Sequence, residues 1–261
     1  MTRMHRASGL WRRGGTPPTR LRPPGDGGFS LIEILVVIVV IGILAGLALP
    51  VFTRARDRAV QAVCKNHLKQ MGLAVRLYLQ YNDNTYFPYV VDTSEGMLYY
   101  YGLERPSPFG DDVRGDLDVT KGYLFPYYSL VSVERCPAFN PISADGKKPN
   151  GATLGFGYNR FGLSGRNANE VMNAESIVLF ADCAHVASGR RSRGSSSLFV
   201  EEFRYVSPTD YTVHFRHAGE ANVLFCDGHV ESRRPVKLFS KLPGSGVGML
   251  NELGDTSLFI P

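Results

Sequence analysis

One uninterrupted apolar run near the N-terminus constrains this chain more than any other feature. From Phe29 to Leu49 the sequence holds 21 residues and a single charge, Glu33. As an α-helix at about 1.5 Å per residue, the run would be roughly 32 Å long, close to the hydrocarbon thickness of a bilayer. The residues after it, starting at Pro50, do not form the small-residue site of a cleaved secretory signal. The run therefore predicts one membrane-spanning helix.

The segment before this run is basic. Residues 1–28 hold six arginines and one acidic residue, Asp26, so they carry a net charge equal to the +5 of the whole chain, and residues 29–261 are neutral overall. A basic flank favours a cytoplasmic position for this leader and an external position for the C-terminal part. The charge is thus no indication of nucleic-acid binding by the folded part. Translation could begin at Met1 or at Met4.

Glu33 requires an explanation, because a carboxylate within a membrane helix costs a few kcal/mol. One reading places it near enough to the interface to reach lipid headgroups. The other gives it a partner: cleavage before Phe29 would create an α-amino cation, which could pair with Glu33 of a neighbouring subunit in a filament.

The run Gly28-Phe29-Ser30-Leu31-Ile32-Glu33 resembles the cleavage and methylation signature of type IV prepilins and type II secretion pseudopilins. The resemblance implies cleavage between Gly28 and Phe29 by a prepilin peptidase, N-methylation of Phe29, and a role for Glu33 in subunit docking. It also implies that Pro50 kinks the helix, as its missing N–H would allow. The 28-residue leader is long for this family.

The same resemblance implies partners and a location. The partners are a prepilin peptidase, homologous pilin or pseudopilin subunits, and an inner-membrane assembly machinery whose ATPase is a different protein. The expected location is a single pass through the inner membrane, with the leader in the cytoplasm and the C-terminal domain periplasmic or extracellular, followed by incorporation into a filament.

Residues 51–83 predict an amphipathic helix. Apolar side chains recur there at spacings of three and four residues: Val60, Val63, Cys64, Leu68, Met71, Val75, Tyr78 and Leu79. The helix should end near Asn82-Asp83-Asn84 and continue the membrane helix of residues 29–50 as one long stalk. Two helices broken at Pro50 are the alternative.

The cysteines, Cys64, Cys136, Cys183 and Cys226, contain no C-x-x-C pair. Outside the cytoplasm disulfides can form, and four cysteines allow three pairings. A bridge between Cys64 and Cys136, which would tie the stalk helix to a later loop, is one of the open alternatives.

Residues 84–261 predict a globular domain. Residues 84–175 are rich in Tyr, Pro and Gly, which favours loops and short elements. The C-terminal third predicts an antiparallel meander with strands at Ile177–Ala181, Tyr211–Arg216, Ala221–Cys226 and His229–Lys237, and Asp227-Gly228 predicts a type I′ hairpin turn. The expected fold class is α+β, with a long N-terminal helix packed on an antiparallel sheet.

His217 and Asp227-Gly228 resemble the H-x9-D-G region of a large pilin-like family, which brings no established catalytic role. A metal site is a separate hypothesis, based on the near-repeat VLFAD (178–182) and VLFCD (223–227). If these strands were parallel neighbours, Asp182 and Asp227 would end at one edge, near His185 and His229, and could bind calcium or zinc. In the alternative both aspartates form turns.

The sequence thus predicts a structural subunit of a type IV pilus-like filament or of a type II secretion pseudopilus, with no required cofactor and no enzymatic activity. A minor, tip-located pilin whose Tyr-rich middle region binds glycans is the first alternative. A membrane-anchored enzyme is the second, although no nucleophile-elbow or H-E-x-x-H pattern supports it.

Overall fold

The computed structural model describes residues 30–106, 117–127, 134–139, 154–190, 196–201, 203–252 and 255–261. The chain divides into two units, Met1–Pro50 and Val51–Pro261. Together the elements confirm the α+β class that the sequence predicts.

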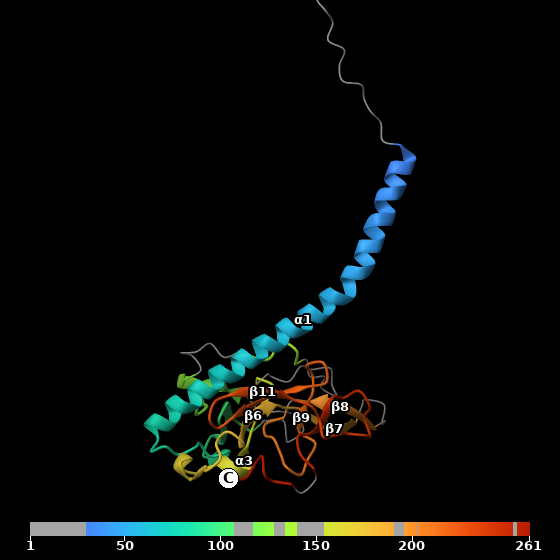
Figure 1. Ribbon diagram of the computed structural model, residues 1–261. Helices are drawn as coiled ribbons and strands as arrows, with labels where there is room; N and C mark the ends of the chain where they lie inside the picture. The colour runs from blue at the N-terminus through green and yellow to red at the C-terminus, as the bar shows by residue number, and fades with distance from the viewer. Residues whose placement is uncertain are drawn as a thin grey trace, which may run out of the picture. The chain divides into compact units, whose positions relative to one another are not determined.

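One long helix, α1 (Leu31–Tyr81), contains both the apolar run and the amphipathic segment (Figure 1). Pro50 lies inside this helix, so the alternative of two helices broken at Pro50 is wrong. Every residue from Leu31 to Pro50 is exposed. Among the described residues, α1 is the one helix long and apolar enough to cross a membrane by length and composition.

The later turns of α1 bury one face against the globular unit. The buried side is close to the predicted stripe, and its residues are Cys64, His67, Leu68, Met71, Gly72, Ala74, Val75, Tyr78 and Leu79. Val63 departs from the prediction, because 44% of it is exposed. The helix ends where predicted: Asp83 and Asn84 take φ values of 49° and 55°, and the Asn82 side chain donates to the Tyr78 carbonyl at 2.7 Å.

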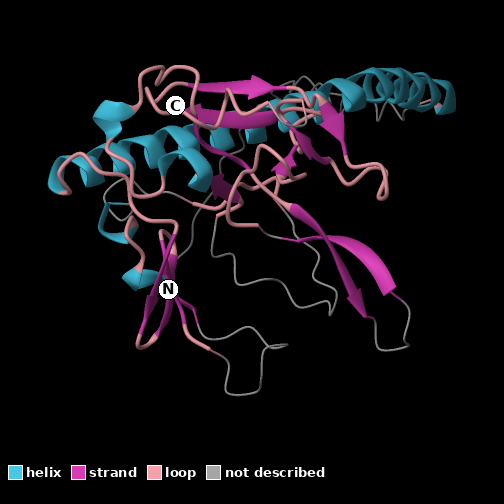
Figure 2. Cartoon of the chain, turned by 90° about the horizontal axis from the view of Figure 1, so that it is seen from below, coloured by secondary structure: helices cyan, strands magenta, loops and turns pink. Residues whose placement is uncertain are grey.

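The strands are short and form several small sheets (Figure 2). The first sheet has the order β1-β2-β3-β4, the second β11-β10-β6-β5, the third β12-β13-β9, and β7 pairs with β8. The strands are β1 (Val90–Thr93), β2 (Gly96–Tyr99), β3 (Gly102–Glu104), β4 (Leu117–Asp118), β5 (Phe156–Tyr158), β6 (Val178–Asp182), β7 (His185–Arg190), β8 (Ser196–Glu201), β9 (Val213–His214), β10 (Ala221–Phe225), β11 (Val230–Arg233), β12 (Lys237–Leu238) and β13 (Val247–Met249). Short helical segments are η1 (Val119–Lys121), α3 (Arg160–Leu163) and η2 (Ala168–Glu170).

The second sheet lies against α1. Strands β6 and β10 are buried along their whole length, as the apolar runs VLFAD and ANVLF require. Gly72 allows the close approach, because a Cβ there would lie 3.2 Å from the Leu224 side chain on β10. At the β11 edge of the sheet, next to β10, Gln61 of α1 donates to Ser232 at 2.8 Å. The packing of the sheet on the stalk helix therefore agrees with the prediction.

The predicted meander is only partly correct. The hairpin of β10 and β11 is present, but the predicted strand Tyr211–Arg216 is reduced to β9, which pairs with β13 rather than with β10. The predicted return strand His229–Lys237 splits into β11 and the first residue of β12. The alternation of apolar and polar residues indicated strands at these places but could not identify their distant partners.

The type I′ geometry predicted for Asp227-Gly228 occurs instead at His217–Glu220, the turn before β10. At His217–Glu220 the end residues exchange two backbone hydrogen bonds of 3.0 Å, and Ala218 and Gly219 both have positive φ, 53° and 84°. This is the type I′ arrangement. After β10, Gly228 has a φ of 92° while Asp227 is not in the left-handed region, so the Asp227-Gly228 turn is a longer loop closed by a left-handed glycine.

Several tyrosines of the middle region are part of the hydrophobic core. Tyr86, Tyr99, Tyr100 and Tyr101 are buried, and the Tyr100 hydroxyl donates to the Phe156 carbonyl at 2.7 Å. These side chains therefore offer little surface for the glycan-stacking role that the sequence left open.

Candidate functional site

The predicted processing residues, Gly28 and Phe29, lie outside the described residues. The first described residues show a role for Glu33 that the sequence analysis missed. The Ser30 backbone N–H donates to Glu33 Oε2 at 2.7 Å, and the Ser30 hydroxyl accepts from the Ile32 N–H at 3.2 Å. The serine and the glutamate three residues later thus cap the start of α1 in the manner of a capping box. The S-x-x-E spacing of Ser30 and Glu33 is the sequence pattern from which this cap could have been predicted.

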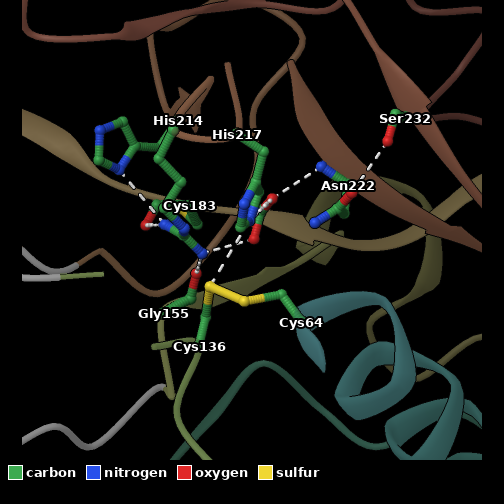
Figure 3. The surroundings of a disulfide bond; sticks show 10 residues. Cys64, Cys136, Gly155, Cys183, His214, His217, Asn222 and Ser232 are labelled. Carbon is green, nitrogen blue, oxygen red and sulfur yellow. Dashed lines mark hydrogen bonds and ion pairs between the residues drawn. A yellow bond between two sulfur atoms is a disulfide. The ribbon is translucent and has the colours of Figure 1, made fainter. Parts of the chain in front are cut away.

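A disulfide joins Cys64 of α1 to Cys136 (Figure 3), which is one of the pairings that the sequence left open. Both residues are fully buried. The two remaining cysteines, Cys183 and Cys226, form no disulfide, and burial raises the pKa of the Cys226 thiol to about 12. The bridge crosses 72 positions of sequence and ties the stalk helix to the segment that contains Cys136.

Asp182, at the end of β6, lies in a buried cluster beside this disulfide. Its carboxylate pairs with the Arg216 guanidinium at 2.5 Å and accepts the Asn222 backbone N–H at 2.7 Å. His217 Nε2 lies 3.3 Å from the same carboxylate. Burial by itself raises the pKa of Asp182, but Arg216 and His217 outweigh it and hold the pKa below its usual value. The aspartate is therefore an ionised, buried acceptor rather than an exposed ligand.

Arg216 extends the cluster to neighbouring loops. Its Nη2 donates to the Gly155 carbonyl at 2.6 Å, and its guanidinium carbon lies 4.7 Å from the centre of the Phe139 ring. Nη1 lies 3.3 Å from His214 Nδ1. Burial, together with the charge of Arg216, lowers the pKa of His214 to about 3. His214 is thus neutral near pH 7 and can accept from the guanidinium.

His217 connects the cluster to the disulfide. Its Nε2 atom lies 3.6 Å from Cys136 Sγ as well as 3.3 Å from Asp182. Because one and the same nitrogen faces both groups, the arrangement is not a nucleophile–histidine–carboxylate relay, in which the two ring nitrogens face different partners. His217 therefore holds the disulfide and β6 together, and the enzyme alternative gains no support from it.

Asp227-Gly228, the other part of the motif, lies at the opposite end of β10. Arg76 of α1 donates to the Asp227 carbonyl, and a Cβ on Gly228 would lie 2.5 Å from Arg76 Nη2. The Asp227 carboxylate accepts the His229 backbone N–H at 3.0 Å and pairs with His229 Nδ1 at 2.6 Å, both on the surface. The sequence could mark the turn but could not indicate that α1 contacts it.

The predicted calcium or zinc site assumed parallel neighbouring strands, and that assumption is wrong. Strands β6 and β10 are antiparallel, with Val223 opposite Ala181, so Asp182 and Asp227 lie at opposite ends of the pair. The one group of at least three potential metal-ligand atoms among the described residues comprises Cys64, Cys136 and His217, within 4.8 Å of one another. Its two sulfur atoms are already joined in the disulfide.

The comparisons with known proteins agree with the N-terminal signature. Residues 24–49 match the family model described as the prokaryotic N-terminal methylation motif. The type IV major fimbrial protein FimA of Dichelobacter nodosus is 28% identical over 178 residues, which cover 67% of this chain and 90% of that protein.

Two further relatives match over shorter stretches. The type IV major pilin protein PilA of Myxococcus xanthus is 37% identical over 60 residues, or 23% of this chain and 27% of that protein. The type II secretion system core protein G of Pseudomonas aeruginosa is 39% identical over 72 residues, or 28% of this chain and 47% of that protein. No solved structure matches the chain. The chain thus carries the prokaryotic N-terminal methylation motif, and its relatives are type IV pilins and a type II secretion protein, as the resemblance predicts.

Proposed function

We propose that this chain is a structural subunit of a type IV pilus-like or type II secretion pseudopilus filament, assembled through the first half of α1. The supporting observation is the exposure of every residue from Leu31 to Pro50. This apolar surface has no cover in the described part of the chain and needs lipid or the helices of other subunits around it. Before assembly the subunit would therefore reside in the inner membrane. On assembly, contacts with the helices of other subunits would replace its contacts with lipid.

Maturation would cut the chain between Gly28 and Phe29 and methylate the new amino group. The partner for this step would be a prepilin peptidase, with the basic leader in the cytoplasm and the domain after residue 50 on the other side. The methylation motif at residues 24–49 supports this processing. An inner-membrane assembly machinery would supply the energy for extraction of the helix.

Glu33 would have two roles in this scheme. Within the subunit it caps α1 by accepting the Ser30 N–H at 2.7 Å. Between subunits its charge would attract the terminal amine of a neighbouring Phe29, because both groups lose hydration within an apolar bundle. The two roles differ in their chemical requirement, since capping needs only an acceptor oxygen whereas docking needs a negative charge.

The H-x9-D-G motif would fasten β10 to the second half of α1. Its histidine end lies against the Cys64–Cys136 disulfide, and its glycine end lies against Arg76. Cys64 and Arg76 are twelve residues apart on α1, or about 18 Å at 1.5 Å per residue. The β10 strand is therefore held at two points along the stalk, which gives the motif a structural rather than a catalytic role.

The first test is the mass of the chain extracted from membranes, with and without a co-expressed prepilin peptidase. We expect a chain that begins at N-methylated Phe29 only when the peptidase is present. Retention of residues 1–28 beside an active peptidase would contradict the proposal.

The second test separates the two roles of Glu33 in a filament-assembly assay. Glu33→Gln keeps an acceptor for the Ser30 N–H but removes the charge, whereas Ser30→Ala removes the hydroxyl acceptor but keeps the charge. We expect processed Glu33→Gln subunits to remain in the membrane without forming filaments, and Ser30→Ala subunits to assemble. Normal filaments from Glu33→Gln would show that the charge has no docking role.

A further inference from the structure

A cavity of about 340 Å³ opens in the globular unit, away from the motif residues discussed above. Its lining comes from β7, from two loop segments and from the residue after β12. The lining residues are His185, Val186, Phe203, Tyr205, Asp210, Tyr211, Thr212 and Phe239. None of them contributes a side chain to the Asp182 cluster or to the methylation motif, so the proposed filament role leaves this cavity without a function.

Aromatic rings form two walls of the cavity. Phe203 and Tyr205 pack against each other with ring centres 4.6 Å apart. Tyr211 and Phe239 form a second pair, edge to face, with centres 5.4 Å apart. Four aromatic rings in two pairs thus line a space large enough for a small organic group.

One carboxylate completes the lining. Asp210 is exposed, and a loop hydrogen bond holds it, since the Ser207 hydroxyl donates to Asp210 Oδ2 at 3.0 Å. Thr212 anchors the same loop by accepting the Ser207 N–H at 2.9 Å. None of the described lining residues is a lysine or an arginine. His185, which stacks on Phe203 with ring centres 4.7 Å apart, is the basic side chain of the described lining, and Asp210 is its carboxylate.

We propose that this cavity binds a quaternary or methylated ammonium group. Aromatic faces carry a negative quadrupole that attracts a cation, and alkylated ammonium ions are typical ligands of such aromatic cages. A primary ammonium would lose more hydration energy on entry, because it is the more strongly hydrated cation. Tyr205, one of the lining residues, already makes such a contact within the chain, because the guanidinium carbon of Arg160 lies 3.9 Å from the centre of its ring. Asp210 adds a full negative charge to this attraction.

The test compares two molecules of the same shape. The mature full-length chain, in nanodiscs of phosphatidylglycerol that carry no ammonium headgroup, is titrated with choline and with its uncharged isostere 3,3-dimethylbutan-1-ol, and binding is followed by calorimetry and ligand-observed NMR. We expect saturable binding of choline and at least roughly tenfold weaker binding of the isostere. This outcome is independent of filament assembly, which the Glu33 variants test separately.

Two variants and a control assign the binding to the cavity. Asp210→Asn keeps an acceptor for the Ser207 hydroxyl but removes the charge, and Phe239→Leu removes one ring of a wall. Each should weaken choline binding by roughly tenfold. Asp255→Asn removes an exposed carboxylate elsewhere and should leave binding unchanged. Near-ultraviolet circular dichroism would show that each variant retains its packing.

Several outcomes would overturn the proposal. Equal binding of choline and the isostere would show an apolar cavity without preference for charge. Saturable binding of glucose that displaces choline would assign the cavity to saccharides. Absence of saturable choline binding, or choline binding that Asp210→Asn and Phe239→Leu leave intact, would remove the assignment altogether.

Discussion

Two aspartates in nearly the same local sequence have different roles in this protein. VLFAD ends at Asp182, which is fully buried and paired with Arg216, whereas VLFCD ends at Asp227, which is exposed in a turn beside His229. The local pattern predicts a strand followed by an acidic residue in both places. Only the tertiary structure determines which carboxylate meets a buried cation.

Substitution of these two residues should affect stability to very different extents. Asp182→Asn leaves the buried Arg216 without its counter-charge and should lower the free energy of unfolding by about 3–5 kcal/mol. Asp227→Asn, the matched control, keeps an acceptor for the His229 N–H and should change it by less than about 1 kcal/mol. Urea unfolding of the full chain, followed by circular dichroism, measures both. Equal effects of the two substitutions would contradict the buried ion pair.

His214 should make stability depend on pH below neutrality. Its pKa falls from 6.5 to about 3 on folding because of burial and the nearby Arg216. The unfolded chain therefore binds more protons between these values, and stability should fall as the pH is lowered from about 6.5 towards 3, by up to about 1.4 kcal/mol per unit. His214→Gln should reduce this slope in urea unfolding at a series of pH values. An unchanged slope would place the titration elsewhere.

At the scale of elements, α1 and the hairpin of β10 and β11 followed their sequence patterns closely. The 3.6-residue periodicity placed the buried face of α1, and Asn82-Asp83-Asn84 placed its end. The turns followed less closely, because the type I′ geometry occurs at Ala218-Gly219 rather than at Asp227-Gly228. A non-glycine residue with a φ of 53° costs energy, which the hydrogen bonds of the His217–Glu220 turn offset.

This turn offers a stabilising substitution. Ala218 is exposed and left-handed, and asparagine tolerates that conformation better than alanine does. Ala218→Asn should therefore raise the free energy of unfolding by about 0.5–1 kcal/mol. Asp227→Asn serves as the comparison, because position 227 is not left-handed and should show no such gain. Destabilisation by Ala218→Asn in the same urea assay would contradict the assigned turn.

For the whole molecule, the globular unit depends on links between distant segments. The disulfide joins positions 64 and 136, and β9 pairs with β13 more than thirty residues later. The Asp182 cluster then joins β6, the segment after β9 and the start of β10 around this bridge. These links hold the sheet on the stalk helix without a continuous meander.

Loss of the disulfide should destabilise the globular unit measurably. Closure of a loop of this length contributes about 4 kcal/mol in the chain-entropy description. The variant with Cys64→Ser and Cys136→Ser should lose a comparable amount of unfolding free energy. A dithiol reductant should lower the stability of the natural chain in the same way and leave the double variant unaffected. A natural chain insensitive to the reductant would contradict a stabilising bridge.

The sequence by itself determined the features that depend on neighbouring residues. A 21-residue apolar run, the spacing of apolar side chains in the stalk and the signature around Phe29 each lie within one short segment. The membrane helix, the amphipathic helix, the hairpin and the resemblance to pilins could therefore be read directly. The capping role of Glu33 was readable too, since S-x-x-E is a local pattern.

The tertiary structure alone decided the features that join distant segments. Strand patterns specify which face is buried but not which partner lies alongside, so the antiparallel pairing of β6 with β10 separated Asp182 from Asp227. The choice among three cysteine pairings, the contact of His217 with the disulfide and the aromatic cavity likewise arise from segments brought together only by folding. Periodicity describes one segment at a time, whereas a buried ion pair or a cavity requires the packing of several.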